Sequence, residues 1–165
     1  LKLAKKQKKN FIVYTTEVRP LMQGRLTARE LAKHGIKVVV LPDLAAEQAI
    51  KKCDLFFFGA DGLTKRGVVN KIGTSTLCNI AKDYGVRRFV CANSLKFAKK
   101  VKIEERNGQE VWDEREKNIE VWYPAFDMTR WKFVSEVICE MGILPPGKFV
   151  KVAKGNKILF GKAFR

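Results

Sequence analysis

The sequence has 165 residues, enough for one domain that buries roughly two-thirds of its unfolded surface without disulfide bonds. Its formal net charge is +16, and residues 1–10 and 147–165 together carry 11 of these charges without a single acid. The +5 that remains on residues 11–146 suits a phosphate-sized ligand better than a nucleic-acid groove. We therefore do not expect nucleic acid as a partner, and the basic ends can equally serve solubility.

The spacing of the cysteines argues against a metal site, and the hydropathy argues against a membrane span. Cys53, Cys78, Cys91 and Cys139 form no CxxC pair and have only His34 as a companion, so we expect reduced thiols and no metal site. No apolar run approaches the roughly 20 residues of a bilayer span, and no signal peptide is visible. We therefore expect a cytoplasmic protein that does not contact membranes.

In the first third of the chain, short β-branched or aromatic runs alternate with helical patterns. Gly35 is a stop signal for the first helix, and Asp43 can cap the second. We predict, in chain order, strand 11–15, helix 25–34, strand 36–41, helix 44–52 and strand 54–58.

The same alternation continues to the end. Thr74 can cap a helix that closes at Gly85, Pro124 stops a later strand, and Gly142 stops a last helix. The predicted elements are helix 75–84, strand 87–91, strand 119–123, helix 130–141 and, around Gly155-Asn156, a β-hairpin over 149–160.

Strands that alternate with helices are typical of crossover units. The predicted fold class is therefore α/β: a doubly wound, mostly parallel sheet of at least five strands with helices on both faces. We expect residues 1–165 to form a single domain in which 147–165 is a basic tail.

In open α/β sheets, ligands bind beyond the carboxyl ends of the strands, where several loops meet. Asp61 directly follows the apolar run 55–60, so its carboxylate would lie at the mouth of an apolar wall. Loss of hydration there suits a carboxyl group to proton transfer. Asp61 is therefore our candidate acid or base.

Amide and cationic side chains in the same loops can hold the oxygen atoms of a ligand. Asn70 and Lys71 offer an amide and an ammonium group, and residues 73–74 begin a helix whose first N–H groups favour an anion. The other cations that can pair with phosphate are Arg19, Arg25 and Lys96. These residues predict a small phosphorylated ligand.

Other chemistries find less support. The chain has neither GxGxxG after a strand nor GxxxxGK[ST], so no nucleotide cofactor is predicted. A single histidine, His34, makes a Ser–His–Asp triad untenable. Trp112, Trp122 and Trp131 lie near basic residues and could stack on RNA, but packing in a core or interface is favoured.

Several motifs occur in order along the chain: TTEVRPLMQGRLTARELAKHGIKVVVLPD, FFGADGLTKRGVVNKIGT, NSLKF and VWYPAFDMT…EMGILPP. Together they resemble the carboxyl-terminal half of one family. That family joins the alpha, beta and delta regulatory subunits of translation initiation factor 2B with methylthioribose-1-phosphate isomerase and ribose-1,5-bisphosphate isomerase. The resemblance covers roughly residues 11–146 and implies a Rossmann-like fold. The segment from KIEERNGQEVW to KNIEVWYPAFDMT is most similar to the archaeal ribose-bisphosphate isomerases.

The resemblance also implies roles for individual residues. In isomerases of this family the aspartate of the GAD motif is catalytic, and it corresponds to Asp61. The substrate contacts of the NK motif correspond to Asn70 and Lys71, the glutamine of the RP…QG motif to Gln23, and the lysine of the KF motif to Lys96. The expected ligand is a phosphorylated sugar or nucleotide, with no cofactor.

Family isomerases carry a catalytic cysteine and a helical amino-terminal domain upstream of the matched segments. We therefore expect the 165-residue chain to be inactive, or nearly so, on its own. The chain has Tyr123 and Arg130-Trp131 where the family usually has Asn-Pro and Thr-Pro-Pro around the PAFD motif. Family members pair through this half, which implies a homodimer.

Two functions agree with the resemblance. The first is an aldose–ketose isomerase domain that converts ribose 1,5-bisphosphate to ribulose 1,5-bisphosphate, which the retained Asp61 favours. The alternative is an initiation-factor-2B-like regulatory subunit that binds a sugar phosphate or nucleotide and contacts translation initiation factor 2.

Overall fold

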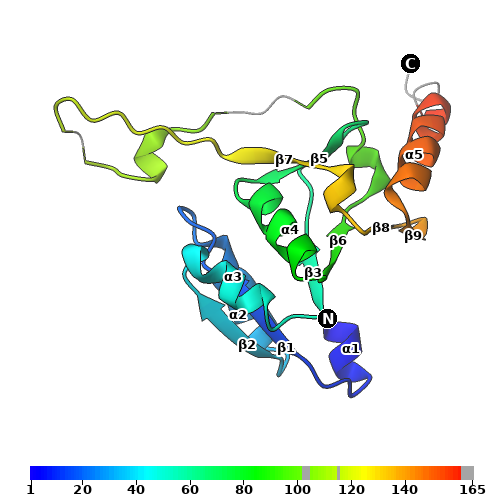
Figure 1. Cartoon of the computed structure of the whole chain (residues 1–165), viewed down its shortest axis with the longest axis horizontal. Helices are drawn as coiled ribbons and strands as arrows, with labels where there is room; N and C mark the ends of the chain where they lie inside the picture. The colour runs from blue at the N-terminus through cyan, green and yellow to red at the C-terminus, as the bar shows by residue number, and fades with distance from the viewer. Residues whose placement is uncertain (102–104, 115, 161–165) are drawn as a thin grey trace. The chain divides into compact units, whose positions relative to one another are not determined.

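The computed structural model of the chain is shown in Figure 1. The residues it describes are 1–101, 105–114 and 116–160, with side chains described as far as residue 155. Residues 161–165 of the predicted basic tail lie outside this part. So do residues 102–104 and 115, which belong to the segment most similar to the archaeal isomerases.

The chain divides into two compact units. The first combines Leu1–Cys53 with Asn107–Tyr123, and the second combines Asp54–Arg106 with Pro124–Arg165. No helix in the described part of the chain is both long and apolar enough to cross a membrane. All four cysteines are free, as expected from their spacing.

The first unit is built on a parallel pair of strands, β1 and β2, with residue 12 opposite residue 37. The helix α2, which joins the two strands, packs against both. Predicted strands 11–15 and 36–41 and helix 25–34 are confirmed to within two residues at each end. The elements of this unit are α1 (Lys2–Lys6), β1 (Ile12–Thr16), α2 (Gln23–Ala32), β2 (Lys37–Leu41), η1 (Asp43–Ala45), α3 (Ala46–Ile50) and η3 (Gly108–Glu110).

The second unit contains two sheets (Figure 1). The first has the strand order β3-β6-β8-β9, in which only β9 runs antiparallel to its neighbour. The second has the order β4-β5-β7 and is antiparallel throughout. The strands are β3 (Leu55–Phe58), β4 (Gly62–Leu63), β5 (Gly67–Lys71), β6 (Arg87–Cys91), β7 (Phe126–Arg130), β8 (Glu136–Cys139) and β9 (Gly142–Leu144).

Helices α4 (Thr74–Asp83) and α5 (Pro146–Phe160) cover these sheets, and α4 packs against β7, β6 and β3. The core between them is apolar and fully buried. Its least exposed members include Leu63, Val68, Cys78, Val90, Val137 and Phe149. Burial of this thiol raises the pKa of Cys78 to about 12, so it is a packing residue and not a nucleophile.

The fold class is α/β, as predicted, and predicted strands 54–58 and 87–91 and helix 75–84 are present. The described strands form three sheets of two, four and three strands. The sequence predicted one mostly parallel sheet of at least five. The antiparallel sheet is the unexpected part, because β4 has only 2 residues and the pairing of β5 with β7 joins distant parts of the chain.

The strand predicted at 119–123 is absent. Its aromatic and β-branched residues have no partner strand in the described part, and β-propensity without pairing does not make a strand. Ile119 and Trp122 are 50% and 73% exposed. The tryptophans were expected to pack in a core or interface, and Trp131 packs against the core of the second unit. Trp112 and Trp122 are exposed in this chain, so for them packing in an interface stays a prediction.

The helix predicted at 130–141 is wrong. This stretch contains the end of β7, the short turn η4 (Trp131–Phe133) and β8. Gly142, taken as a helix stop, has φ +100° and closes a tight turn between β8 and β9. Val137 is fully buried in the sheet, so pairing with β6 overrode the helical pattern.

The hairpin predicted at 149–160 is also wrong, because this stretch lies in the helix α5. Phe149 and Ala153 are spaced four residues apart and are both buried, as one face of a helix requires. Phe149 packs edge-on against Phe97 and at a tilt against Trp131. This burial favours the helix over the turn suggested by Gly155-Asn156.

Candidate functional site

The candidate site in the second unit is built on the hairpin of β4 and β5, which the sequence analysis missed. Gly62 pairs with Val69, and the N–H of Asp61 donates to the carbonyl oxygen of Val69 at 2.9 Å. The hairpin therefore brings Asn70 back beside the end of β3. This return of the chain explains how Asp61 and Asn70 can serve one site.

The buried side chain of Thr64 holds the turn of this hairpin. Its hydroxyl donates to the carbonyl oxygen of Gly67 at 3.0 Å and accepts from the N–H groups of Arg66 and Gly67 at 3.1 and 3.2 Å. The indole N–H of Trp131 donates to the Thr64 carbonyl oxygen at 3.0 Å. A Cβ at Gly67 would lie 2.1 Å from the carbonyl oxygen of Thr129, so only glycine fits there.

Two predicted site residues, Asn70 and Lys96, lie beside the segment 59–61. The amide oxygen of Asn70 lies 3.8 Å from the position that a Cβ on Gly59 would take. The ammonium group of Lys96 donates to the carbonyl oxygen of Ala60 at 2.5 Å. The structure thus brings Asn70 and Lys96 to the residues that immediately precede Asp61.

Asp61 itself is exposed, and its carboxylate has no side-chain partner in the described part of the chain. The apolar wall expected around it is not found. Strand alternation sends Phe56 and Phe58 toward the core, whereas Leu55 and Phe57 are 45% and 44% exposed. The described residues therefore present the carboxylate of Asp61 to solvent.

Lys71 lies on the other face of β5 from Asn70. Neighbouring residues of a strand point to opposite faces, and the register places Asn70 opposite Asp127 and Lys71 opposite Phe126. The adjacency of the two residues in sequence therefore does not put both side chains on one surface. Lys71 is half-buried at the end of the strand.

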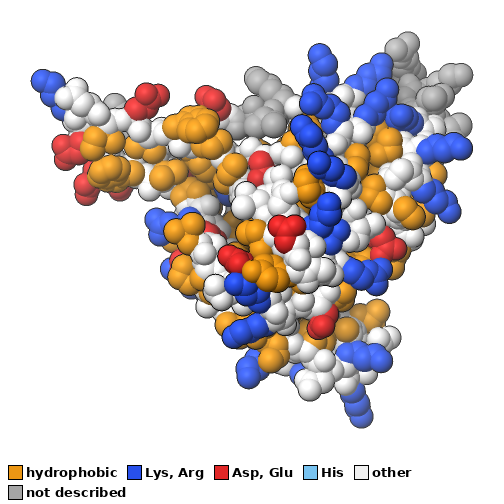
Figure 2. All heavy atoms as spheres, viewed as in Figure 1, with side chains coloured by type: hydrophobic (Ala, Val, Ile, Leu, Met, Phe, Trp, Pro, Cys, Tyr) orange, Lys and Arg blue, Asp and Glu red, His pale blue; other side chains and the backbone are white. Residues whose placement is uncertain are grey.

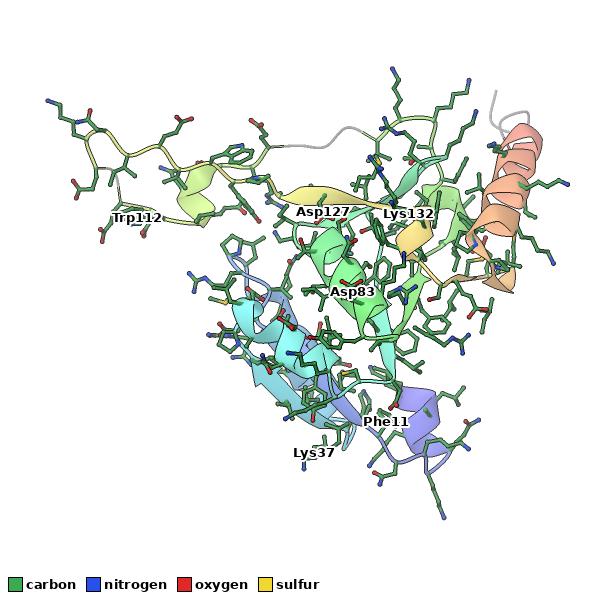
Figure 3. The ribbon with its side chains drawn as sticks, viewed as in Figure 1. Phe11, Lys37, Asp83, Trp112, Asp127 and Lys132 are labelled. Carbon is green, nitrogen blue, oxygen red and sulfur yellow. The ribbon has the colours of Figure 1, made fainter. Side chains whose placement is uncertain are left out.

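Asp127 lies on β7 and caps α4 (Figure 3). Its carboxylate accepts from the N–H of Gly73 at 2.8 Å and from that of Ser75 at 3.1 and 3.2 Å. Burial raises the pKa of Asp127, although these hydrogen bonds act in the opposite direction. The helix start that we predicted to favour an anion is thus occupied by an anion of the protein itself.

Thr74, the predicted cap of this helix, makes a different contact. Its hydroxyl donates to the carbonyl oxygen of Lys71 at 2.6 Å and accepts from the side-chain amide of Asn70 at 3.0 Å. The capping prediction is therefore wrong, and Thr74 orients the amide of Asn70. With its N–H₂ directed to Thr74, that amide leaves its oxygen toward Gly59.

Glu140 holds the turn η2 (Ser94–Lys96), which carries Lys96. Its carboxylate accepts from the N–H of Ser94 at 3.0 Å and from the Ser94 hydroxyl. These hydrogen bonds lower the pKa of Glu140. Nothing in the sequence signalled this residue, because its partner lies 46 positions away.

The remaining predicted contacts, Gln23, Arg19 and Arg25, belong to the first unit. Gln23 begins α2 and is exposed, as is Arg19. Arg25 forms an ion pair with Glu17, which its Nε approaches to 2.8 Å. A phosphate would have to compete with Glu17 for Arg25. That these three residues share one site with Asp61 stays a prediction.

Asp43 fixes the loop that carries Arg19. It does not cap a helix as predicted, because its two carboxylate oxygens accept from the N–H groups of Val18 and Arg19, at 2.8 Å each. Burial acts to raise the pKa of Asp43, but hydrogen bonds from Arg19, Thr16 and Val18 outweigh it and the pKa is lowered. Val18 has φ +58°, which is an unfavourable backbone conformation for a β-branched residue. The two hydrogen bonds to Asp43 help to hold it.

A family model described as the initiation factor 2 subunit family matches residues 1–146. The chain belongs to the initiation factor 2 subunit family. Within this family it is 42% identical to the ribose 1,5-bisphosphate isomerase of Thermococcus kodakarensis, over 88% of this chain and 49% of that protein. It is 38% identical to the ribose 1,5-bisphosphate isomerase of Pyrococcus furiosus, over 100% of this chain and 54% of that protein.

A solved structure of a family member is also similar. The translation initiation factor eIF-2B of Pyrococcus horikoshii has a TM-score of 0.80 and 32% sequence identity, over 90% of this chain and 54% of that chain. The chain thus spans about half the length of the curated relatives that it matches.

The capping role of Asp127 predicts a loss of stability in Asp127→Ala. The substitution removes the acceptor of the Gly73 and Ser75 N–H groups at the start of α4, so we expect the free energy of unfolding in urea to fall by about 1–2 kcal/mol. The control is Asp83→Ala at the other end of α4, where a carboxylate opposes the helix dipole. That variant should be unchanged or slightly more stable. Equal losses in the two variants would contradict the capping role.

Proposed function

We propose that this chain is part of an aldose–ketose isomerase that converts ribose 1,5-bisphosphate to ribulose 1,5-bisphosphate. The observation that carries the proposal is the meeting of Asn70 and Lys96 at the peptide segment that ends in the unpaired carboxylate of Asp61. The two relatives described above, which are named for this reaction, support the choice of substrate. Because the chain spans about half of those proteins, the activity is proposed for a protein of their full length.

The proposed chemistry is redox-neutral. The hydrogen that leaves C2 of the aldose is gained by C1, and the C1–O4 bond of the sugar ring breaks. The proton of the C2 hydroxyl passes to O4, and C2 becomes a carbonyl. Asp61 would carry a proton between these carbons, or between a hydroxyl group and the catalytic cysteine that the family resemblance implies. An exposed carboxylate is a weak base in water, so the rest of the protein would have to exclude solvent from it.

Asn70 and Lys96 would hold substrate oxygens, and Lys71, which lies on the other face of β5, would bind one only from that face. The ammonium group of Lys96 has three N–H donors and uses one on the carbonyl oxygen of Ala60, so two remain for a hydroxyl or phosphate oxygen. The amide oxygen of Asn70 would accept from a hydroxyl group. Fixing these groups on a hairpin and a short turn pre-organises them, which lowers the cost of ordering them around the substrate.

Further parts of the proposal concern the whole protein. Gln23, Arg19 and Arg25 would complete the substrate site. The parallel strands, without the antiparallel sheet β4-β5-β7, would form the doubly wound sheet predicted from the sequence. We also propose a cytoplasmic homodimer that pairs through this half of the protein.

The isomerase proposal predicts the effect of Asp61→Asn. The test joins this chain to the portion of the Thermococcus kodakarensis isomerase that precedes the matched region and measures ribulose 1,5-bisphosphate formation. We expect kcat to fall by about 10²–10⁴-fold, the usual contribution of a positioned acid or base. The control is Asp54→Asn, at the other end of β3, which should keep kcat. Undiminished turnover in Asp61→Asn would contradict the proposal.

A second candidate function is that of a regulatory subunit, which the similarity to the eIF-2B structure favours. Calorimetry of the same chimaera with ribose 1,5-bisphosphate and with a purified translation initiation factor 2 subunit separates the two functions. The isomerase proposal predicts binding and turnover of the sugar and no binding of the factor. Micromolar binding of the factor without turnover would support the regulatory function instead.

A further inference from the structure

Two arginines, Arg66 and Arg130, lie at the end of the β4-β5-β7 sheet that is farther from Asn70. Arg66 lies in the turn between β4 and β5, and Arg130 is the last residue of β7, where it pairs with Gly67. Together with Met128 they line a surface hollow of about 420 Å³. Figure 2 shows Lys and Arg side chains gathered over this part of the second unit.

No acid in the described part of the chain neutralises either guanidinium. In the described part of the chain Arg66 and Arg130 make no side-chain hydrogen bond and no ion pair. Two other exposed arginines pair with acids: Arg25 with Glu17 and Arg87 with Glu136. Two like charges at neighbouring positions repel each other, and an anion between them would remove that repulsion.

The backbone that carries the pair is rigid. The Thr64 hydroxyl fixes the N–H of Arg66, and the close packing of Gly67 on Thr129 fixes the turn against β7. Trp131, which follows Arg130 in the chain, also holds the turn, because its indole N–H donates to the carbonyl oxygen of Thr64. A pre-organised pair of cations loses little conformational freedom when it binds a ligand.

Arg130 and Trp131 are adjacent in the chain at the end of β7. Arg130 supplies a cation of the hollow, and Trp131 fixes the turn that carries the second cation. The proposed isomerase site uses neither residue.

We propose that Arg66 and Arg130 bind the phosphate group of a small phosphorylated molecule at a site separate from the isomerase site. Guanidinium groups bind phosphate through paired N–H donors, and Met128 offers an apolar contact for the carbon part of the ligand. The volume lies within the range of small-molecule sites. Along β5, Gly67 and Lys71 are four residues apart, or about 13 Å, so one phosphate cannot occupy both ends.

The test is a titration of the chain with inorganic phosphate, at constant ionic strength, followed by the backbone amide NMR signals. We expect saturable shifts at Arg66, Gly67 and Arg130. In Arg66→Gln/Arg130→Gln the apparent affinity should fall at least about tenfold, as the loss of two charge-assisted hydrogen bonds implies. The matched control is Arg87→Gln, whose arginine already pairs with Glu136 and which should leave the affinity unchanged.

A more conservative variant distinguishes loss of phosphate binding from loss of folding. Arg130→Lys keeps the charge but loses the planar fork, so its affinity should lie between that of the unsubstituted chain and that of the double variant. Shifts that rise without saturation would overturn the proposal. So would shifts that survive the double variant, or shifts that are largest at Asn70 and Lys71. Because no isomerase assay is involved, a failed isomerase test does not affect this result.

Discussion

The geometry of both candidate sites in the second unit depends on the hydrogen bonds of the buried Thr64 hydroxyl. It binds both ends of the turn between β4 and β5 and so sets the register that pairs Asp61 with Val69. At one end of the hairpin this register places Asn70 beside the segment that ends in Asp61. At the other end the same turn presents Arg66 next to the end of β7. One polar contact therefore positions the candidate isomerase site and the candidate phosphate site.

The carboxylates of the chain divide into structural and available groups. Asp127 binds the start of α4, Glu140 binds the turn that carries Lys96, and Asp43 binds the loop that carries Arg19. In each case the acceptor satisfies backbone N–H groups that would otherwise lack partners. Asp61 differs from these three, because its carboxylate is exposed and makes no such contact in the described part of the chain. Three acids thus position backbone, and Asp61 is the acid to which the proposed function assigns the proton transfer.

The sequence could predict elements whose signals are local. β1, β2, β3 and β6 are apolar runs between helical segments, and Asp61 and Lys96 follow two of them. It could not predict β8, whose pairing with β6 overrode a helical pattern, or β9, which pairs with β8. Nor could it predict the β4–β5 hairpin, whose turn has no Asn-Gly signal. Asp127 and Glu140 were missed because their partners lie 54 and 46 positions away. Non-local contacts of this kind leave no periodic trace in the sequence.

The most direct measurement is amide hydrogen exchange at Asp61 in a Thr64→Val variant, which removes the hydroxyl at nearly constant volume. If the hydroxyl sets the hairpin register, the N–H of Asp61 should lose protection about tenfold, the equivalent of one hydrogen bond. The amide of Val39, in the β1–β2 pair of the first unit, should keep its protection. Unchanged protection at Asp61 would show that the turn forms without Thr64 and would contradict the account.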